Sequence, residues 1–194
     1  GQCGGSPEAC QNLSCGLDPL FGTNCGACNA GFFCLGGSCE EGTPAQEACG
    51  RFNQDRAAMS EHSWSGSISG CSEASMSDEW QEDALLNVNL YRWFADLPPL
   101  TLNPSWYAGQ QKCALIIDAN NSLSHNPPSW WSCYSSLGAD HAGSSNIATM
   151  PAVIAGDLYM IDPGNETTMG HRRWILSNWV KQTAFGSTKD YSCM

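Results

Sequence analysis

The clearest pattern of apolar and polar positions lies between residues 78 and 97. Apolar side chains recur there at intervals of four, three and four residues, at Leu86, Leu90, Trp93 and Leu97. This is the spacing of one face of a helix. Ser75 or Ser77 precedes it as a candidate N-cap, acidic residues fill the first turn, and Pro98 and Pro99 end the pattern. The sequence therefore predicts an amphipathic helix over residues 78–97.

A second helix is predicted over residues 104–121. Its inward positions are Trp106, Cys113, Ile116 and Ile117. Gly109 is a weak point in it, because glycine lowers helix stability. Residues 144–148, 152–161 and 174–185 are candidate short strands or helices, separated by turn-forming residues. A mixture of this kind is typical of an α+β fold.

The first 50 residues differ in composition from the rest of the chain. They hold eight of the twelve cysteines and no Trp, Tyr, Lys or Arg, so they are too poor in apolar surface for an ordinary core. Cross-links would have to order this segment, in a pairing that the sequence leaves open. Residues 40–46 have the charged and turn residues of a linker. We predict a disulfide-rich, mostly irregular module over 1–42, a linker and Ser-rich irregular stretch over 43–77, and a conventional domain over 78–194.

The pair Cys25 and Cys28 has the spacing of a redox site or of half a zinc site. No histidine follows it, no βαβ pattern surrounds it and no second close pair accompanies it, so disulfides are the favoured interpretation. The run of Cys and Gly over residues 3–39 resembles short modules in surface proteins of myxobacteria. That resemblance implies a spacer or adhesion element.

Charge and cysteine content restrict the function classes. With 19 acidic and 8 basic residues, the net charge of −11 argues against a nucleic-acid partner. The longest apolar stretches fall far short of the ~18 residues of a membrane-spanning helix. Abundant cysteine indicates an oxidising compartment, so we predict a secreted protein whose first residue lies near a processed start. The sequons at Asn12, Asn120 and Asn165 would carry glycans in a eukaryotic source.

Histidine is the main candidate for chemistry, because motifs for nucleophilic catalysis and phosphate binding are absent. His125, His141 and His171 fall within one 50-residue region. Two imidazoles that converge in a cleft would bind Zn²⁺ or transfer protons. A lone loop histidine is more often a hydrogen-bonded structural residue, and both interpretations stay open from the sequence.

The order of several short motifs is similar to that of the CAP superfamily, the cysteine-rich secretory, antigen 5 and pathogenesis-related proteins, in its divergent bacterial-type branch. The matching residues cover about 78–186; they are Asn87, Arg92, Leu100, Leu102, residues 123–125, residues 143–148 and residues 170–176. The resemblance implies an α-β-α sandwich with a small sheet. It also implies a cleft in which two His and two Glu hold a divalent cation, with His125 and His171 at the histidine positions.

Two departures from that family pattern affect the interpretation. Ser145 stands where the family has the first cleft glutamate, and Asp157, Asp162 and Glu166 are the candidates for the second acid. The chain also stops soon after the last motif, which leaves a reduced sheet or a fragment whose edge is open to another chain. No motif in the sequence identifies a cofactor. The candidate cofactor is a divalent cation such as Zn²⁺, held by His125 and His171.

Three functions follow as hypotheses. The leading one is a secreted, non-enzymatic CAP-like protein for binding or assembly at the cell surface, with the ligand cleft formed by His125, Ser145 and His171. Its ligand would be an extracellular carbohydrate, lipid or protein, and Trp130 and Trp131 form either an exposed aromatic surface or a packed loop clamped by Cys133. The alternatives are a metal-assisted hydrolase and a self-assembling subunit of an extracellular filament or sheath.

Overall fold

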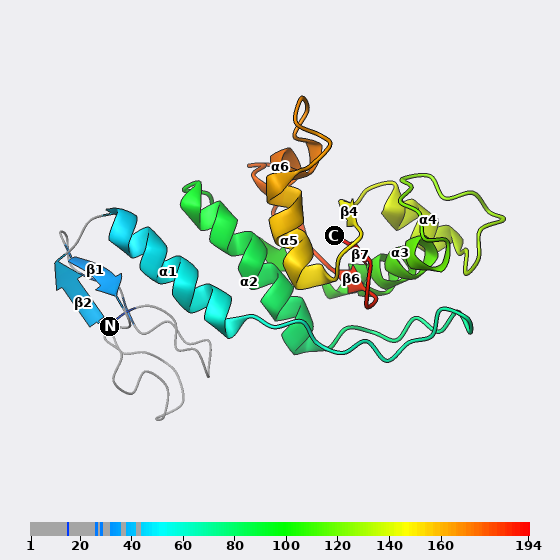
Figure 1. The fold of residues 1–194 in the computed structure, drawn as a ribbon, viewed down its shortest axis with the longest axis horizontal. Coiled ribbons are helices and arrows are strands. Elements are labelled where there is room, and N and C mark those ends of the chain that lie inside the picture. The colour runs from blue at the N-terminus through cyan, green and yellow to red at the C-terminus, as the bar shows by residue number, and fades with distance from the viewer. Residues whose placement is uncertain (1–14, 16–25, 27, 29–31, 36–37, 42–43) are drawn as a thin grey trace. The chain divides into compact units, whose positions relative to one another are not determined.

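The chain folds into two compact units, residues 1–58 and residues 59–194 (Figure 1). The structure is a computed structural model, and it describes Cys15, Gly26, Cys28 and residues 32–35, 38–41 and 44–194. Helices and short strands occur together in it, so the predicted α+β character is confirmed.

The described part of the first unit is a hairpin followed by a helix. Strands β1 (Phe32–Leu35) and β2 (Ser38–Glu41) pair antiparallel. Two disulfides support them, Cys15–Cys34 and Cys28–Cys39. The predicted disulfide-supported module is confirmed for these four cysteines. Since Cys28 is oxidised with Cys39, it is neither a redox partner of its CxxC neighbour nor a zinc ligand.

The predicted linker is helical in its first part. Helix α1 (Pro44–Ala58) begins inside the stretch that was predicted as a linker. Proline is well tolerated as the first residue of a helix, and the Ala, Gln, Glu and Arg residues that follow have high helix propensity. The turn residues before Pro44 therefore precede a helix rather than a long linker. Residues 59–77 are irregular as predicted, apart from a bridge between Ser67 and Ser72.

Helix α2 (Asp78–Phe94) is the predicted amphipathic helix, with Ser77 as its N-cap. The Ser77 hydroxyl accepts a hydrogen bond from the backbone N–H of Trp80 at 3.2 Å. The predicted C-terminus was wrong by three residues, because the helix ends before the prolines. Asp96 adopts a left-handed φ of 54°, and the N–H of Leu97 turns back to the carbonyl of Arg92 at 2.9 Å.

The second predicted helix is divided. A 3-10 turn, η1 (Pro104–Trp106), precedes α3 (Tyr107–Ala119). Cys113, Ile116 and Ile117 are buried as predicted, but Trp106 lies before the helix and is 39% exposed. A Cβ on Gly109 would lie 2.1 Å from the His141 ring, so this glycine is a site of close packing.

The remaining elements are short helices and strands, and the strands form two small sheets. The helices are α4 (Ser136–Ala142), α5 (Ala152–Ile161) and α6 (Gly170–Ile175). The strands are β3 (Thr101–Leu102), β4 (Ile147–Ala148), β5 (Gln182–Thr183), β6 (Gly186–Ser187) and β7 (Ser192–Cys193). Strands β3 and β5 pair parallel, and β7 lies between β4 and β6 in an antiparallel sheet. The last residues of the chain therefore occupy the middle of a sheet.

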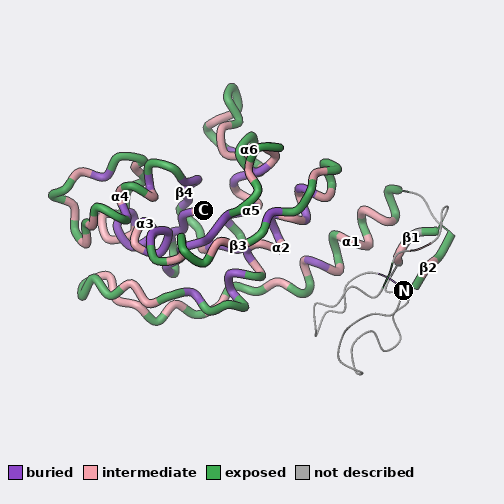
Figure 2. The backbone as a smooth tube through the Cα atoms, turned by 180° about the vertical axis from the view of Figure 1, so that it is seen from behind, coloured by how far each residue is buried: buried purple, intermediate pink, exposed green. Residues whose placement is uncertain are grey.

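The core of the second unit joins helices and strands that are distant in sequence. Buried stretches lie along α2, α3, α5 and the strands near the C-terminus (Figure 2). One cluster includes Trp80, Val88 and Phe185. A second cluster surrounds the buried disulfide Cys113–Cys193, which ties α3 to β7. The other disulfide of this unit is Cys71–Cys133.

The buried Arg92 links α2 to the segment that contains α6. Its side chain is inaccessible to solvent, and its guanidinium donates to the carbonyl oxygens of Pro98, Ile175 and Ser177. One guanidinium nitrogen has no partner in the described part of the chain. Three carbonyl acceptors thus replace a counter-ion, and they fix the C-terminal end of α6 against the core.

Candidate functional site

The second unit has a cleft of about 900 Å³. Its walls come from η1, α3, α4, α6, β5 and the loops between them. The sequence candidates His125, Ser145 and His171 all line this cleft, and His141 lines it too. A volume of this size is at the upper end of the ~300–1,000 Å³ of small-molecule sites.

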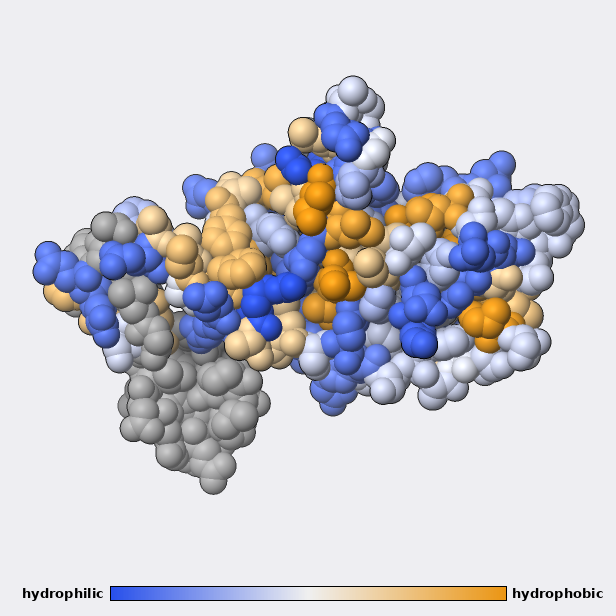
Figure 3. Space-filling model, viewed as in Figure 1, coloured by the Kyte–Doolittle hydropathy of each residue, from blue (hydrophilic) through white to orange (hydrophobic). Residues whose placement is uncertain are grey.

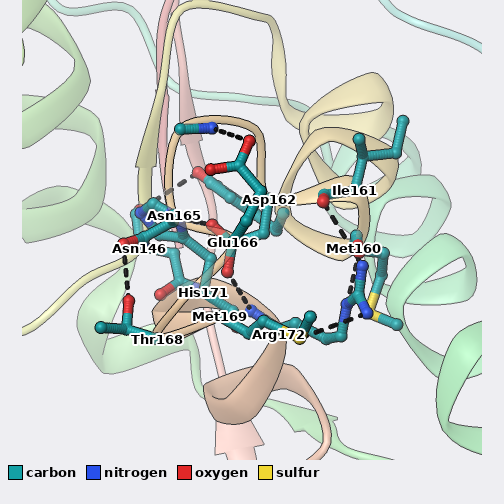
Figure 4. Close-up of polar contacts among 12 residues, drawn as sticks. Asn146, Met160, Ile161, Asp162, Asn165, Glu166, Thr168, Met169, His171 and Arg172 are labelled. Carbon is teal, nitrogen blue, oxygen red and sulfur yellow. Dashed lines mark hydrogen bonds and ion pairs between the residues drawn. The ribbon is translucent and has the colours of Figure 1, made fainter.

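The His171 side chain is positioned by a buried carboxylate (Figure 4). Asp162 is 1% exposed, and its Oδ1 lies 2.7 Å from Nδ1 of His171. A carboxylate only accepts hydrogen bonds, so Nδ1 carries the proton and Nε2 is the free nitrogen of the neutral ring. Burial alone would raise the pKa of Asp162, but hydrogen bonds from the His171 ring, a backbone N–H and an asparagine side chain hold that pKa below its ordinary value.

Local backbone geometry explains why Asp162 points this way. It caps the C-terminus of α5 in a left-handed conformation, with φ 57°. Its second oxygen accepts the backbone N–H of Arg172 at 3.3 Å. The loop between α5 and α6 is closed further by Asn165, whose side-chain oxygen accepts the hydroxyl of Thr168 at 2.7 Å. The carboxylate therefore holds both the ring and the backbone at the start of α6.

His125 has the same tautomer for a different reason. Its Nδ1 lies 2.8 Å from the carbonyl oxygen of Ala142. A carbonyl only accepts, so Nδ1–H donates and Nε2 again carries the free lone pair of the neutral ring. The two family-matched histidines thus each have one nitrogen engaged by an oxygen of the protein and one that remains for a ligand.

His141 is held by packing. Its ring lies against Gly109, and no hydrogen bond to either ring nitrogen occurs within the described residues. Burial lowers the pKa of His141, although the nearby Asp140 carboxylate opposes this. Burial therefore favours the neutral form of this ring. The sequence placed His141 among three candidates, but it did not indicate the contact with Gly109.

Ser145 is a buried structural residue of the cleft wall. Its Oγ lies 2.9 Å from the Gln110 side-chain oxygen and 2.6 Å from the His141 carbonyl oxygen. A catalytic serine needs an imidazole nitrogen that takes its proton. The single hydroxyl proton of Ser145 can go to only one of these two oxygens. No imidazole nitrogen hydrogen-bonds this hydroxyl among the described residues, so Ser145 is not an activated nucleophile.

The three candidate acids have different surroundings. Asp157 accepts hydrogen bonds from Tyr91 and Asn87, and Glu166 accepts the backbone N–H of Gly164. Asp162 is the candidate that contacts a family-matched histidine. It engages the ring on Nδ1, the side opposite the nitrogen that would bind a metal.

These residues do not fit the divalent cation that the family resemblance implies. Within the described chain, no three potential ligand atoms that include a histidine lie within 4.8 Å of one another. The three sulfurs that meet this criterion belong to Cys15, Cys28 and Cys39, which are in disulfides. Ser145 supplies a hydroxyl that is already hydrogen-bonded where a carboxylate ligand would be needed.

Two tryptophans at the cleft were not predicted as site residues. Trp106 of η1 and Trp174 of α6 both line it, and Trp174 is 64% exposed. The aromatic pair predicted from the sequence was Trp130 and Trp131 instead. Trp130 is 80% exposed, as predicted for an aromatic surface. Trp131 is half-buried beside the disulfide-bonded Cys133, as predicted for a packed loop.

Fixed charge is absent from the side chains that line the cleft. None of the lining residues is Asp, Glu, Lys or Arg, although the chain carries a net charge of −11. The polar lining consists of imidazoles, amides and hydroxyls. The electrostatic character of the cleft is therefore neutral when the histidines are neutral.

Comparison with models of protein families, with characterised proteins and with solved structures finds no match to this chain. None of the described helices is both long and apolar enough to span a membrane. Of the three sequons, the one at Asn12 lies outside the described residues. The Asn120 amide donates to the carbonyls of Ile116 and Ser132, so this side chain closes the C-terminal end of α3.

Proposed function

We propose that the chain is a secreted, non-enzymatic CAP-like protein that binds a ligand at the cell surface through this cleft. The observation that carries the proposal is the composition of the cleft, in which exposed indole rings adjoin neutral hydrogen-bonding groups. Binding sites commonly combine apolar and aromatic surface with a few polar groups. A CAP-like sandwich is supported by the contacts of the β4–β7–β6 sheet with α3 and α5.

The same geometry disfavours hydrolysis by a side-chain nucleophile. Asp162 and His171 form the acid–base half of a catalytic triad, but Ser145 is hydrogen-bonded to amide oxygens. A metal-assisted hydrolase would need further ligands beside His125 and His171, and the described residues do not gather them. Ligand binding without turnover is the function that these contacts support best.

Assembly into a filament has weaker support. The edge strands β4 and β6 are two residues long each, which offers little backbone for pairing with another chain. Figure 3 shows apolar side chains gathered over α5, whose exposed apolar residues include Ile154 and Ile161. Size-exclusion chromatography over a range of concentrations separates the two functions, and a monodisperse monomer would exclude the filament.

NMR of the ¹⁵N-labelled, oxidised chain tests the proposal. A set of small neutral fragments, each containing an aromatic ring and an amide or hydroxyl group, is added in turn. We expect several fragments to shift the indole N–H signals of Trp106 and Trp174, while the signal of Trp130 stays in place. The Trp130→Ala variant is the matched control, since its ring lies outside the cleft.

Turnover is measured on the same protein. Chromogenic esters and casein should be hydrolysed no faster by the parent than by the His125→Ala, His171→Ala double variant. Faster hydrolysis by the parent would contradict the non-enzymatic function. Fragments that bind without shifting the two cleft indoles would contradict the binding site.

A further inference from the structure

We infer that the cleft between Trp106 and Trp174 binds a neutral oligosaccharide. This inference rests on the proposed function and assigns its ligand class. Three properties of the lining residues carry it: their charge, the exposure of their aromatic rings, and the hydrogen bonds that their polar groups can still form.

The absence of formal charge in the lining selects against ionic ligands. A buried carboxylate, sulfate or ammonium group needs an opposite charge close to it, because desolvation of an unpaired ion is costly. None of the lining residues is Asp, Glu, Lys or Arg, and any positive charge on the His171 ring is already paired with the Asp162 carboxylate at 2.7 Å. Repulsion by an acidic chain disfavours polyanions further. The ligand is therefore uncharged.

The exposed indoles indicate a ligand with flat apolar faces. Trp106 and Trp174 are presented by separate elements, η1 and α6, at one cleft. Tryptophan combines a large apolar surface with a polar N–H, and it is well suited to ligands that are partly apolar and partly wet. The C–H face of a pyranose ring is such a surface, and its edge carries hydroxyls.

The remaining hydrogen-bonding groups suit hydroxyls. The Nε2 atoms of His125 and His171 have no hydrogen-bond partner among the described residues, so they can accept. Gln182, whose side-chain oxygen already accepts from Asn103, adds an amide nitrogen that can donate. A hydroxyl also donates and accepts, so it pairs with either group. An acyl chain in the same place would leave these groups without partners, at a cost for each. The lining thus favours a sugar over a lipid tail.

The volume of the cleft favours a short chain of sugars over a monosaccharide. At about 900 Å³, it lies at the upper end of the volumes of small-molecule sites. A chain of linked rings offers more surface than one ring to the tryptophans and histidines that line the cleft. We therefore expect the affinity to rise with the number of sugar units up to a short oligomer.

Calorimetric titration of the full oxidised chain at neutral pH tests the inference. The probes are cellotetraose, chitotetraose and mannotetraose, with tetragalacturonate as the acidic counterpart. We expect saturable binding of at least one neutral tetrasaccharide and none of tetragalacturonate. Trp106→Ala and Trp174→Ala should each weaken binding by about tenfold or more, and the control Trp130→Ala should leave it unchanged.

Three results would overturn the inference. The first is no binding of the neutral tetrasaccharides at millimolar concentration while fragments still shift the cleft indoles, which would leave the proposed binding function standing. The second is sugar binding that survives both tryptophan substitutions. The third is binding of phosphatidylcholine vesicles that is lost with Trp106→Ala and Trp174→Ala, which would assign a lipid ligand to the same site.

Discussion

The described elements of the first unit are a short hairpin and helix α1, and the buried residue of α1 is the polar Asp55. The second unit, in contrast, encloses Trp80, Leu90 and many other apolar side chains. Both units contain disulfides. In the first unit, Cys15–Cys34 and Cys28–Cys39 hold strands of four residues, whereas in the second unit Cys113–Cys193 lies within an apolar cluster.

This difference shows what each unit can support. A cleft with a fixed shape needs walls that are held by packing, because a loop on a loosely packed segment does not keep its geometry. The cleft walls belong to the unit that has a core. In the N-terminal unit, the two described disulfides join the strands of the hairpin to the cysteines that precede it.

The largest effect is expected from a core truncation in the second unit. Trp80 is 1% exposed, and its ring N–H donates to Glu61 at 2.7 Å. The substitution Trp80→Ala removes a large buried ring and should lower the free energy of unfolding by about 3–5 kcal/mol. Urea unfolding followed by the fluorescence of the other tryptophans measures it. The control Trp130→Ala should change stability by less than about 0.5 kcal/mol.

Removal of single disulfides should show whether the two units unfold independently. Loss of Cys113–Cys193, which closes a loop with a sequence separation of 80 residues, should cost the second unit about 3–4 kcal/mol yet leave it folded. Alanine is the replacement of choice, because both positions are fully buried. The disulfide Cys28–Cys39 lies in the first unit, so its loss should leave the urea midpoint of the second unit unchanged. All eight tryptophans lie within residues 64–179, so their fluorescence follows the second unit. A common shift in both variants would show that the units unfold together.

A smaller effect is expected at the cleft. Asp162→Asn keeps the size of the side chain but removes the charge that accepts from His171, and it should cost about 1–2 kcal/mol at neutral pH. The pKa of Asp162 is depressed in the folded state, so its contribution is complete above the ordinary Asp pKa of ~3.9 and is lost as the pH falls through the folded value. The variant should therefore lose less stability than the parent on acidification. Equal acid sensitivity of the two proteins would refute this assignment.

The smallest effect is a histidine titration. The pKa of His141 is lowered in the folded state by burial, so its protonation opposes folding. Its contribution to stability is present above the ordinary value of ~6.5 and declines as the pH falls below that value. In an NMR titration, the His141 ring should titrate with a midpoint below that of histidine in the urea-unfolded chain. A higher midpoint would show that the ring is not desolvated against Gly109.

Local patterns in the sequence predicted the two longest helices of the second unit, α2 and α3, but not α4 or α6. The periodic apolar positions of α2 and the cap residue Ser77 are local features, so they were visible without tertiary information. Helix α1 was missed because turn residues precede it and it lacks an apolar face. The end of α2 was misplaced because a left-handed Asp96, rather than the prolines, stops the helix.

The site was less predictable than the fold. His125 and His171 were candidates through their order in the chain, and the structure places both at one cleft. The choice of Asp162 among three acids depends on the loop between α5 and α6, which turns it toward His171. Trp106 was expected to be buried, and Trp174 has no local feature that marks it. Their place at the cleft depends on long-range packing, such as the contacts of Arg92 with the end of α6.

The central claim is that the cleft histidines are hydrogen-bonding groups of a binding site and not ligands of a catalytic metal. Calorimetric titration with Zn²⁺ at neutral pH, on the parent and on the His125→Ala, His171→Ala double variant, tests it directly. We expect the two proteins to give the same weak, non-stoichiometric heat. Stoichiometric binding by the parent that the double variant loses would contradict the claim and favour a metal-assisted hydrolase.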